Sequence, residues 1–298
     1  MSNIGSIIEE RPRQVGNFLV GRLLPFHRKR ALDPFVFIDH MGPVAMNDHE
    51  NVDIGPHPHI GLSTLTYLFE GSILHRDGLG TRPAITPGAV NWMTAGSGIV
   101  PSERTPVHLR QADKHMHGLQ IRVALPKDQE RKAPSFHPVE AHALPCCKQD
   151  GAKYKLIADE VLGHCSPVPV CSRLYLLEIA CGTDHEVSFD ESSYGEAGLY
   201  ILRGEVHTGG ESFAPRRIMM AQDASRCGFR MAADTTVYLS GGEAFLEERL
   251  IHWNFGATDQ HGIDQAKQRW RDRYRPKPPG ETDPIPPPSN ATADDPFH

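Results

Sequence analysis

The stretch DIGPHPHIGLSTLTYLFEG, residues 53–71, places two histidines, His57 and His59, directly before a run of apolar and small polar residues. Such a run predicts a β-strand, and side chains two residues apart on an extended segment face the same side. Both imidazoles would then point at one spot. A metal ion would explain this arrangement, and a turn that merely favours Pro and His is the alternative.

Short apolar runs that end in Gly or Pro continue outward from this stretch, over about residues 15–125 and again from about residue 173. Strands of this length and spacing, with no helices between them, predict an all-β protein built as a sandwich or barrel. YLFEGSI (67–73) also aligns with YILRGEV (200–206), which indicates either a duplicated barrel or a chance match of common hairpin residues. No His-x-His precedes the second copy, so a metal in the first barrel predicts none in the second.

The C-terminal region has a different pattern. ATDQHGIDQAKQRWRDRY (257–274) predicts a helix with Thr258 or Asp259 as N-cap, and Ile263, Ala266, Trp270 and Tyr274 recur at helical spacing. From Pro276 the chain is too proline-rich and polar for a core and should form an extended tail. The predicted domains are an N-terminal barrel with the metal site (1–130), a connection (131–170), a C-terminal barrel without metal ligands (171–275) and the tail (276–298).

Composition bounds the class of protein. The formal net charge of −6 and the lack of a basic stripe argue against direct nucleic-acid binding. No run reaches the roughly 18 apolar residues of a membrane span, and the N-terminus lacks the pattern of a secretory signal. The six cysteines show no zinc-type spacing, so we expect a cytoplasmic protein with reduced thiols.

A third metal ligand is needed beside the two histidines. GSGIVPSERTP (96–106) supplies one carboxylate, Glu103, about 40 residues later. Two imidazoles and a carboxylate form a facial set that leaves open coordination positions and suits non-haem Fe(II). The alternative is a solvated rim carboxylate paired with Arg104 or Arg82.

Taken together, HPHIGLSTLTYLFEG, WMTAGSGIVPSE (92–103) and HGLQIRV (117–123) resemble the pirin family, and DPFVFIDH (33–40) and IHWNFGATDQ (251–260) extend the resemblance. This resemblance implies two cupin-type antiparallel β-barrels, a bicupin, with a short C-terminal helix. It also implies one divalent metal ion, most often iron, in the N-terminal barrel. The family's ligands are the two histidines of H-P-H, a third histidine and a glutamate.

His57, His59 and Glu103 match this ligand pattern, but Pro101 stands where the family has its third histidine. Three outcomes are open: water fills the position, another histidine (His75, His115 or His117) replaces the ligand, or the metal is lost. Ser63 is a second departure, because cupins commonly carry a Glu there. Its loss can leave an imidazole N–H without an acceptor.

The resemblance implies two kinds of function. The first is a quercetin 2,3-dioxygenase-type enzyme that opens flavonol-like aromatic substrates, with Glu103 accepting the substrate's hydroxyl proton. The second is a non-catalytic regulatory protein, with or without metal, that binds a transcription factor or a metabolic enzyme.

Overall fold

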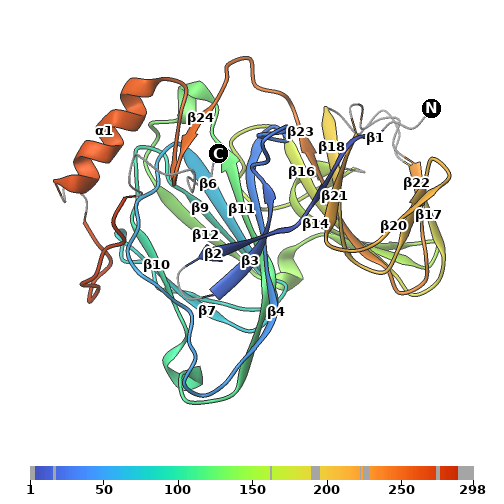
Figure 1. The fold of residues 1–298 in the computed structure, drawn as a ribbon, viewed down its shortest axis with the longest axis horizontal. Coiled ribbons are helices and arrows are strands. Elements are labelled where there is room, and N and C mark those ends of the chain that lie inside the picture. Colours follow the sequence, from blue (N-terminus) through green and yellow to red (C-terminus); the bar gives the residue numbers. More distant parts are fainter. Residues whose placement is uncertain are drawn as a thin grey trace. The chain divides into compact units, whose positions relative to one another are not determined.

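Strands dominate the computed structural model, and α1 (Gln260–Arg271) is the α-helix of its described part (Figure 1). The structure describes residues 4–15, 18–161, 163–188, 195–221, 223, 228–272 and 276–287. Its contacts divide the chain into two compact units. The unit that contains His57-Pro58-His59, called here the HPH unit, is formed from Arg11–Arg30, Val36–Ala141 and Leu246–His298, and the companion unit from Met1–Glu10, Ala31–Phe35 and His142–Phe245.

The HPH unit is built from a seven-stranded and a four-stranded antiparallel sheet. The order in the large sheet is β12 (Ser135–Val139), β9 (Val90–Thr94), β6 (Leu62–Glu70), β11 (Lys114–Ala124), β4 (Phe35–Met46), β3 (Phe18–Leu24), β2 (Arg11–Val15). The order in the small sheet is β5 (Asp53–Ile54), β10 (Pro101–Arg104), β7 (Ile73–Asp77), β8 (Ala84–Ile85). A separate two-stranded sheet consists of β24 (Leu250–His252) and β25 (Phe255–Ala257).

The companion unit repeats the pairing of a large sheet with a small one. The large sheet runs β1 (Ile4–Glu9), β21 (Arg217–Ala221), β18 (Glu196–Arg203), β23 (Thr236–Gly242), β16 (Leu174–Cys181), β14 (Ala152–Val161), β13 (Cys146–Gln149), and β15 (His164–Cys165) pairs with β14. The small sheet runs β17 (His185–Ser188), β22 (Gly228–Met231), β19 (Val206–Thr208), β20 (Glu211–Phe213). The fold is therefore all-β, as the sequence predicts.

The repeated sequence forms an equivalent hairpin in each unit. β6 passes to β7 through Gly71, with φ +87°, and β18 passes to β19 through Gly204, with φ +83°. A Cβ on Gly71 would lie 2.2 Å from the carbonyl oxygen of His115, so both backbone angle and space require glycine. In each unit this turn connects the large sheet to the small one.

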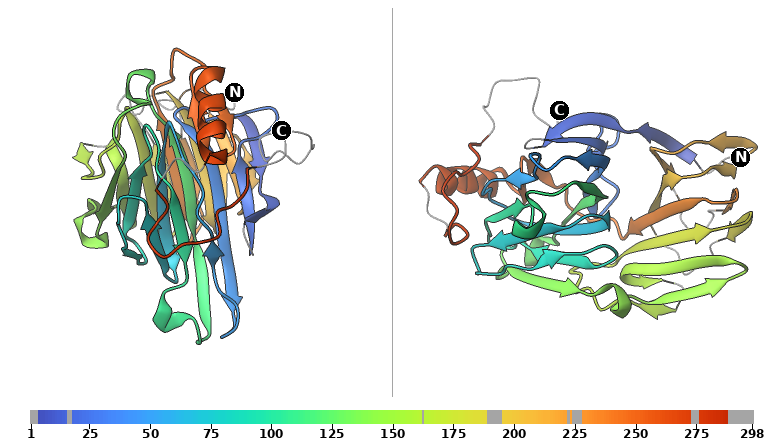
Figure 2. Two further views of the ribbon diagram at one scale, coloured as in Figure 1. Left: turned by 90° about the vertical axis from the view of Figure 1, so that its left-hand side faces the viewer. Right: turned by 90° about the horizontal axis from the view of Figure 1, so that it is seen from below.

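The C-terminal helix α1 belongs to the HPH unit. Asp259 caps it, and the Asp259 carboxylate accepts a 2.7 Å hydrogen bond from the Gly262 backbone N–H. Ile263, Ala266 and Trp270 form the buried face, as predicted. The predicted Tyr274 lies outside the described residues. α1 lies at the edge of the unit, beside β24 and β25 (Figures 1 and 2).

The two compact units are not two consecutive parts of the sequence, because each combines segments that lie far apart along the chain. β1 pairs with β21 although more than 200 residues separate them, and β12, β13 and β14 lie in the stretch predicted as a connection. AKYKLIADEV (152–161), predicted as a further strand, is β14. Composition marks this stretch as polar and proline-rich, but only long-range register shows which sheet each of its strands joins.

Candidate metal centre

The two histidines are held by backbone pairing with the segment that leads into β10. The His59 N–H donates to the Ile99 carbonyl at 2.8 Å, and the Ile99 N–H donates back to the His59 carbonyl at 3.1 Å. The His57 N–H donates to the carbonyl of Pro101 at 3.1 Å. Pro101 opens β10, a position where its missing N–H is tolerated. The two buried rings lie with their centroids 5.0 Å apart.

Glu103 reaches the same place from β10, where it pairs with Ile54 of β5 and His75 of β7. Its Oε2 atom lies 3.9 Å from Nε2 of His57. Oε2 is buried and has no hydrogen-bond partner among the described residues. The carboxylate therefore faces the histidines, and the predicted alternative partner Arg104 is instead paired with Glu281 and Asp53.

His57, His59 and Glu103 line one cavity of about 90 Å³ between the two sheets of the HPH unit. The remaining lining is mixed apolar and polar: Val15, Phe18, Val20, Arg22, Phe37, Asp39, Met41, Val52, Ile54, Thr64, Ile73, Met93, Gln120 and Arg122. A larger cavity of about 260 Å³ lies beside α1, and none of the predicted site residues lines it. The small cavity is the candidate site because the chemistry-bearing side chains converge there.

Both histidines are neutral at pH 7. Burial lowers the pKa of His57, although the Glu103 carboxylate opposes the shift, and burial lowers the pKa of His59 well below its usual value. Nδ1 of His57 lies 2.8 Å from the Gly55 carbonyl oxygen. If Nδ1 carries the proton in that contact, Nε2 presents its lone pair toward Glu103, which is the form that binds a metal.

Among the described residues, Nδ1 of His59 has no such orienting partner, although this atom is buried. Ser63, which stands where cupins commonly carry a glutamate, is fully buried, and its hydroxyl lies 3.1 Å from that of Thr94. Thr64, not Ser63, lines the cavity, so Ser63 faces the other side of β6 and the structure does not link it to the unpartnered nitrogen of His59.

Three charged residues that were not predicted from sequence also line the cavity. Asp39 accepts two 2.9 Å hydrogen bonds from Arg22, and both side chains are almost fully buried. Arg122 packs over Phe37, with its guanidinium carbon 4.1 Å from the ring centroid, and burial lowers its pKa to about 10. The available signal was a charge inside an otherwise apolar strand, as in FVFIDH and LQIRVAL.

The three possible replacement histidines do not join the lining of the cavity. His75 is buried opposite Glu103, but its Nε2 lies 3.1 Å from Oδ2 of Asp77 and its ring stacks on Phe136. His115 is exposed. Nε2 of His117 lies 2.8 Å from Nε2 of His40. None of these three histidines therefore points into the cavity at the position of the third family ligand.

The donor set fits a divalent cation in part. Two neutral imidazoles and a carboxylate with an unpartnered oxygen are the right chemistry. Adjacent ligands on an octahedral ion are about 3 Å apart, so the 3.9 Å gap between His57 and Glu103 would have to close slightly. No cluster of three or more His, Cys, Asp or Glu side chains in the described ranges has metal-site geometry. The donor chemistry therefore suits a divalent cation, but the described side chains do not lie at ligating distances.

Comparison with known proteins identifies the family. The family model described as Pirin matches residues 17–123, and that described as Pirin C-terminal cupin domain matches residues 176–275. A pirin-like protein of Caulobacter vibrioides is 42% identical over 90% of this chain and 93% of its own length. The chain belongs to the pirin family. A Pseudomonas aeruginosa relative, named as a proposed quercetin 2,3-dioxygenase, is 34% identical over 86% of this chain and 80% of its own length.

Solved structures agree with the bicupin fold. A crystal structure of quercetin 2,3-dioxygenase from Acinetobacter baumannii matches with a TM-score of 0.88 and 28% identity, covering 96% of this chain and 95% of that one. A bacterial pirin from Escherichia coli, solved in complex with nickel(II), matches with a TM-score of 0.62 and 15% identity, covering 80% and 99%. The pirin-family chain described here is thus a bicupin with a short C-terminal helix. Its described residues include no helix long and apolar enough to cross a membrane.

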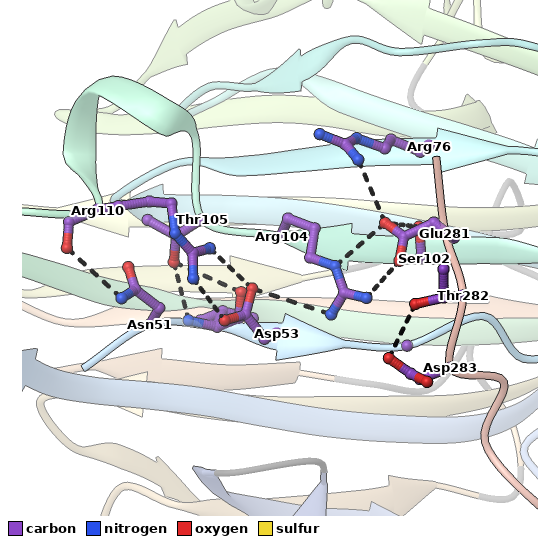
Figure 3. Close-up of polar contacts among 12 residues, drawn as sticks. Asn51, Asp53, Arg76, Ser102, Arg104, Thr105, Arg110, Glu281, Thr282 and Asp283 are labelled. Atoms are coloured by element: carbon purple, nitrogen blue, oxygen red, sulfur yellow. Dashed lines mark hydrogen bonds and ion pairs between the residues drawn. The ribbon is translucent and has the colours of Figure 1, made fainter. Parts of the chain in front are cut away.

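The tail of this pirin-family chain binds to β7 and β10 through Glu281 (Figure 3). Glu281 accepts hydrogen bonds from Arg104, from Ser102 at 3.2 Å and from Arg76 at 3.3 Å. The Ile285 N–H donates to the carbonyl of Pro56 at 2.8 Å. The tail therefore contacts both the β10 strand that carries Glu103 and the segment that carries His57.

Proposed function

We propose that this chain is a metal-dependent oxygenase of the quercetin 2,3-dioxygenase type, with His57, His59 and Glu103 as its metal ligands. The observation that carries the proposal is the convergence of these three side chains on one buried cavity, with His57 Nε2 and Glu103 Oε2 3.9 Å apart. The similarity to the Acinetobacter baumannii quercetin 2,3-dioxygenase supports the reaction type.

A bound divalent ion, iron by the family pattern, would supply the redox chemistry and the positioning of substrate and dioxygen. The chain's own residues have separate tasks. Glu103 accepts the proton of the substrate's acidic hydroxyl, because its Oε2 atom has no competing partner among the described residues. The Gly55 carbonyl holds the His57 ring in orientation, and apolar side chains such as Met93 and Ile73 limit the entry of water.

A second candidate function is a non-catalytic interaction protein that binds a transcription factor or a metabolic enzyme. Two observations favour it. Pro101 removes one family ligand, and the cavity of about 90 Å³ is smaller than the roughly 300–1,000 Å³ of pockets for drug-sized ligands. Under this proposal the chain needs neither substrate turnover nor a filled metal site.

Oxygen uptake with quercetin separates the two candidates. The iron-loaded wild-type chain should consume oxygen in proportion to quercetin. The rate of Glu103→Gln should be at least about 100-fold lower, because the variant lacks both a proposed metal ligand and the proton acceptor. Glu186→Gln, which changes an exposed glutamate of the companion unit, is the matched control and should keep the full rate. No uptake by the iron-loaded wild type would favour the interaction protein, and full activity of Glu103→Gln would contradict the proposed role.

A further inference from the structure

The cavity of about 260 Å³ beside α1, called here the α1 cavity, belongs to the HPH unit, and none of the residues of the proposed metal site lines it. One of its walls is a single face of α1, formed by Gly262, Gln265, Ala266 and Arg269. Other parts of the lining come from the turn that follows β9, from β25 and from the segment after the 3₁₀ helix Lys127–Gln129. A cavity of this kind, with polar groups in its walls, is a common binding site for a small molecule.

Two arginines of the α1 cavity have no counter-charge. Arg131 and Arg269 both line the cavity and are exposed. Neither side chain forms a salt bridge or a hydrogen bond in the described part of the chain. Asp259 also lines the cavity, but its carboxylate caps α1 by accepting the Gly262 N–H. The two guanidinium groups are therefore available to an anionic ligand, and their planar forks suit a carboxylate.

Glu130 brings a negative charge to the same cavity. Its side chain is 11% exposed, and burial raises the pKa of the carboxyl group. Oε2 accepts a 3.1 Å hydrogen bond from the Thr258 hydroxyl, whereas Oε1 is buried and has no hydrogen-bond partner among the described residues. Nε of Arg249 lies 3.9 Å from Oε1, too far for a hydrogen bond, and the Arg249 guanidinium is shared with Glu247. One carboxylate oxygen at the wall of the cavity is therefore left without a donor.

We infer that the α1 cavity is a binding site for a small zwitterion of the amino-acid class, with its carboxylate at Arg131 and Arg269 and its ammonium at Glu130. Uncompensated cations and a carboxylate with an unsatisfied oxygen are complementary to a ligand that carries both charges. The terminal torsion of a glutamate is soft, so the Glu130 carboxylate can turn Oε1 toward an ammonium. The inference is independent of the proposed oxygenase function, because it uses no residue of the metal site.

Calorimetric titration of the full chain with each of the common L-amino acids tests the inference. The titrations contain EDTA, which prevents an amino acid from binding through a metal ion. At least one amino acid should bind with a Kd of about 1 mM or lower. The carboxylic acid that lacks only its α-amino group should bind at least about tenfold more weakly, because it leaves Glu130 without a donor.

Variants of the charged residues distinguish the α1 cavity from other sites on the chain. Arg131→Gln and Arg269→Gln should each weaken amino-acid binding about tenfold, because each removes a charge-assisted hydrogen bond to the carboxylate. Glu130→Gln should remove the preference for the amino acid over the acid without the amino group. Arg271→Gln changes an exposed arginine of α1 that does not line the cavity, and this matched control should bind as the wild type does.

Because Arg131 and Arg269 are exposed, their glutamine variants should fold even if Glu130→Gln does not. The inference would be overturned if no amino acid bound to the wild type, or if binding were unaffected by both arginine substitutions. Equal affinity for an amino acid and for the acid without its amino group would also overturn it, because the cavity would then be a site for anions alone.

Discussion

The two units have equivalent pairs of neighbouring strands, but the side chains between these strands differ in polarity. In the HPH unit β6 and β11 pair Thr66 with Gln120, whose side chains hydrogen-bond at 3.0 Å. The corresponding strands of the companion unit, β18 and β23, pair Leu199 with Leu239, and both belong to its apolar core. The interior of the companion unit is therefore packed with apolar side chains, whereas the HPH unit has a cavity lined in part by polar ones. A duplicated architecture does not imply a duplicated site.

The largest effect should come from breaking the buried ion pair of the HPH unit. Asp39→Ala leaves Arg22 buried without its carboxylate partner and should lower the free energy of unfolding by about 3–5 kcal/mol. Urea unfolding measures this loss. Asp53→Ala, at the half-exposed pair with Arg110, should cost no more than about 1 kcal/mol, and an equal loss in both variants would contradict the account.

A polar side chain in the apolar core of the companion unit should lower the free energy of unfolding nearly as much as the loss of Asp39. Leu239→Gln places an amide in a closed apolar core and should cost about 2–4 kcal/mol of unfolding free energy, measured in the same way. The reverse change, Thr66→Leu with Gln120→Leu, removes both hydrogen-bond partners together and should be close to neutral. A destabilisation as large as that of Leu239→Gln would show that the polar ladder is needed for folding.

The sequence predicts two barrels with one candidate site, but it does not predict the buried ion pairs of the HPH unit. The alternation around residues 62–70, the repeat at Tyr67 and Tyr200, and the lack of a His-x-His before the second copy all point to two barrels with one candidate site. Pairing of Arg22 with Asp39 depends on the register of β3 and β4, which a local pattern does not contain. The attachment of Glu281 to Arg104 spans 177 residues and was equally hidden.

A smaller loss of unfolding free energy is expected when the contact between the tail and β10 is removed. Glu281→Gln replaces a buried carboxylate that accepts from two arginines and should cost about 2 kcal/mol. Glu243→Gln, at the exposed pair with Arg173, should cost less than about 1 kcal/mol. Both are measured by urea unfolding, and equal effects would mean that the tail contact does not stabilise the HPH unit.

The same contact predicts a pH dependence. Burial raises the pKa of Glu281, but the hydrogen bonds from Arg104 and Ser102 and the charges of Arg104 and Arg76 together outweigh burial and hold the pKa below its usual value. A depressed folded-state pKa gives stability that is present above the unfolded value, about 4.3, and is lost as pH falls through the folded value. The difference in stability between wild type and Glu281→Gln should therefore shrink below about pH 4, and a constant difference would contradict this assignment.

Restoring the absent family ligand should have the smallest effect in free energy. Pro101→His adds an imidazole where the family has one and should raise metal affinity by about tenfold, measured by competition with a chelator. Because the His57 N–H needs only the carbonyl of residue 101, the backbone pairing can persist. Unchanged affinity would mean that the residue at position 101 does not face the metal.

Metal content per chain, measured after purification without added metal, shows whether the cavity of the HPH unit binds the ion and the companion unit does not. Wild type and His185→Ala, which removes the buried histidine that contacts Tyr154 in the companion unit, should each hold about one equivalent. His57→Ala should hold none. Metal retained by His57→Ala, or lost from His185→Ala alone, would contradict the account.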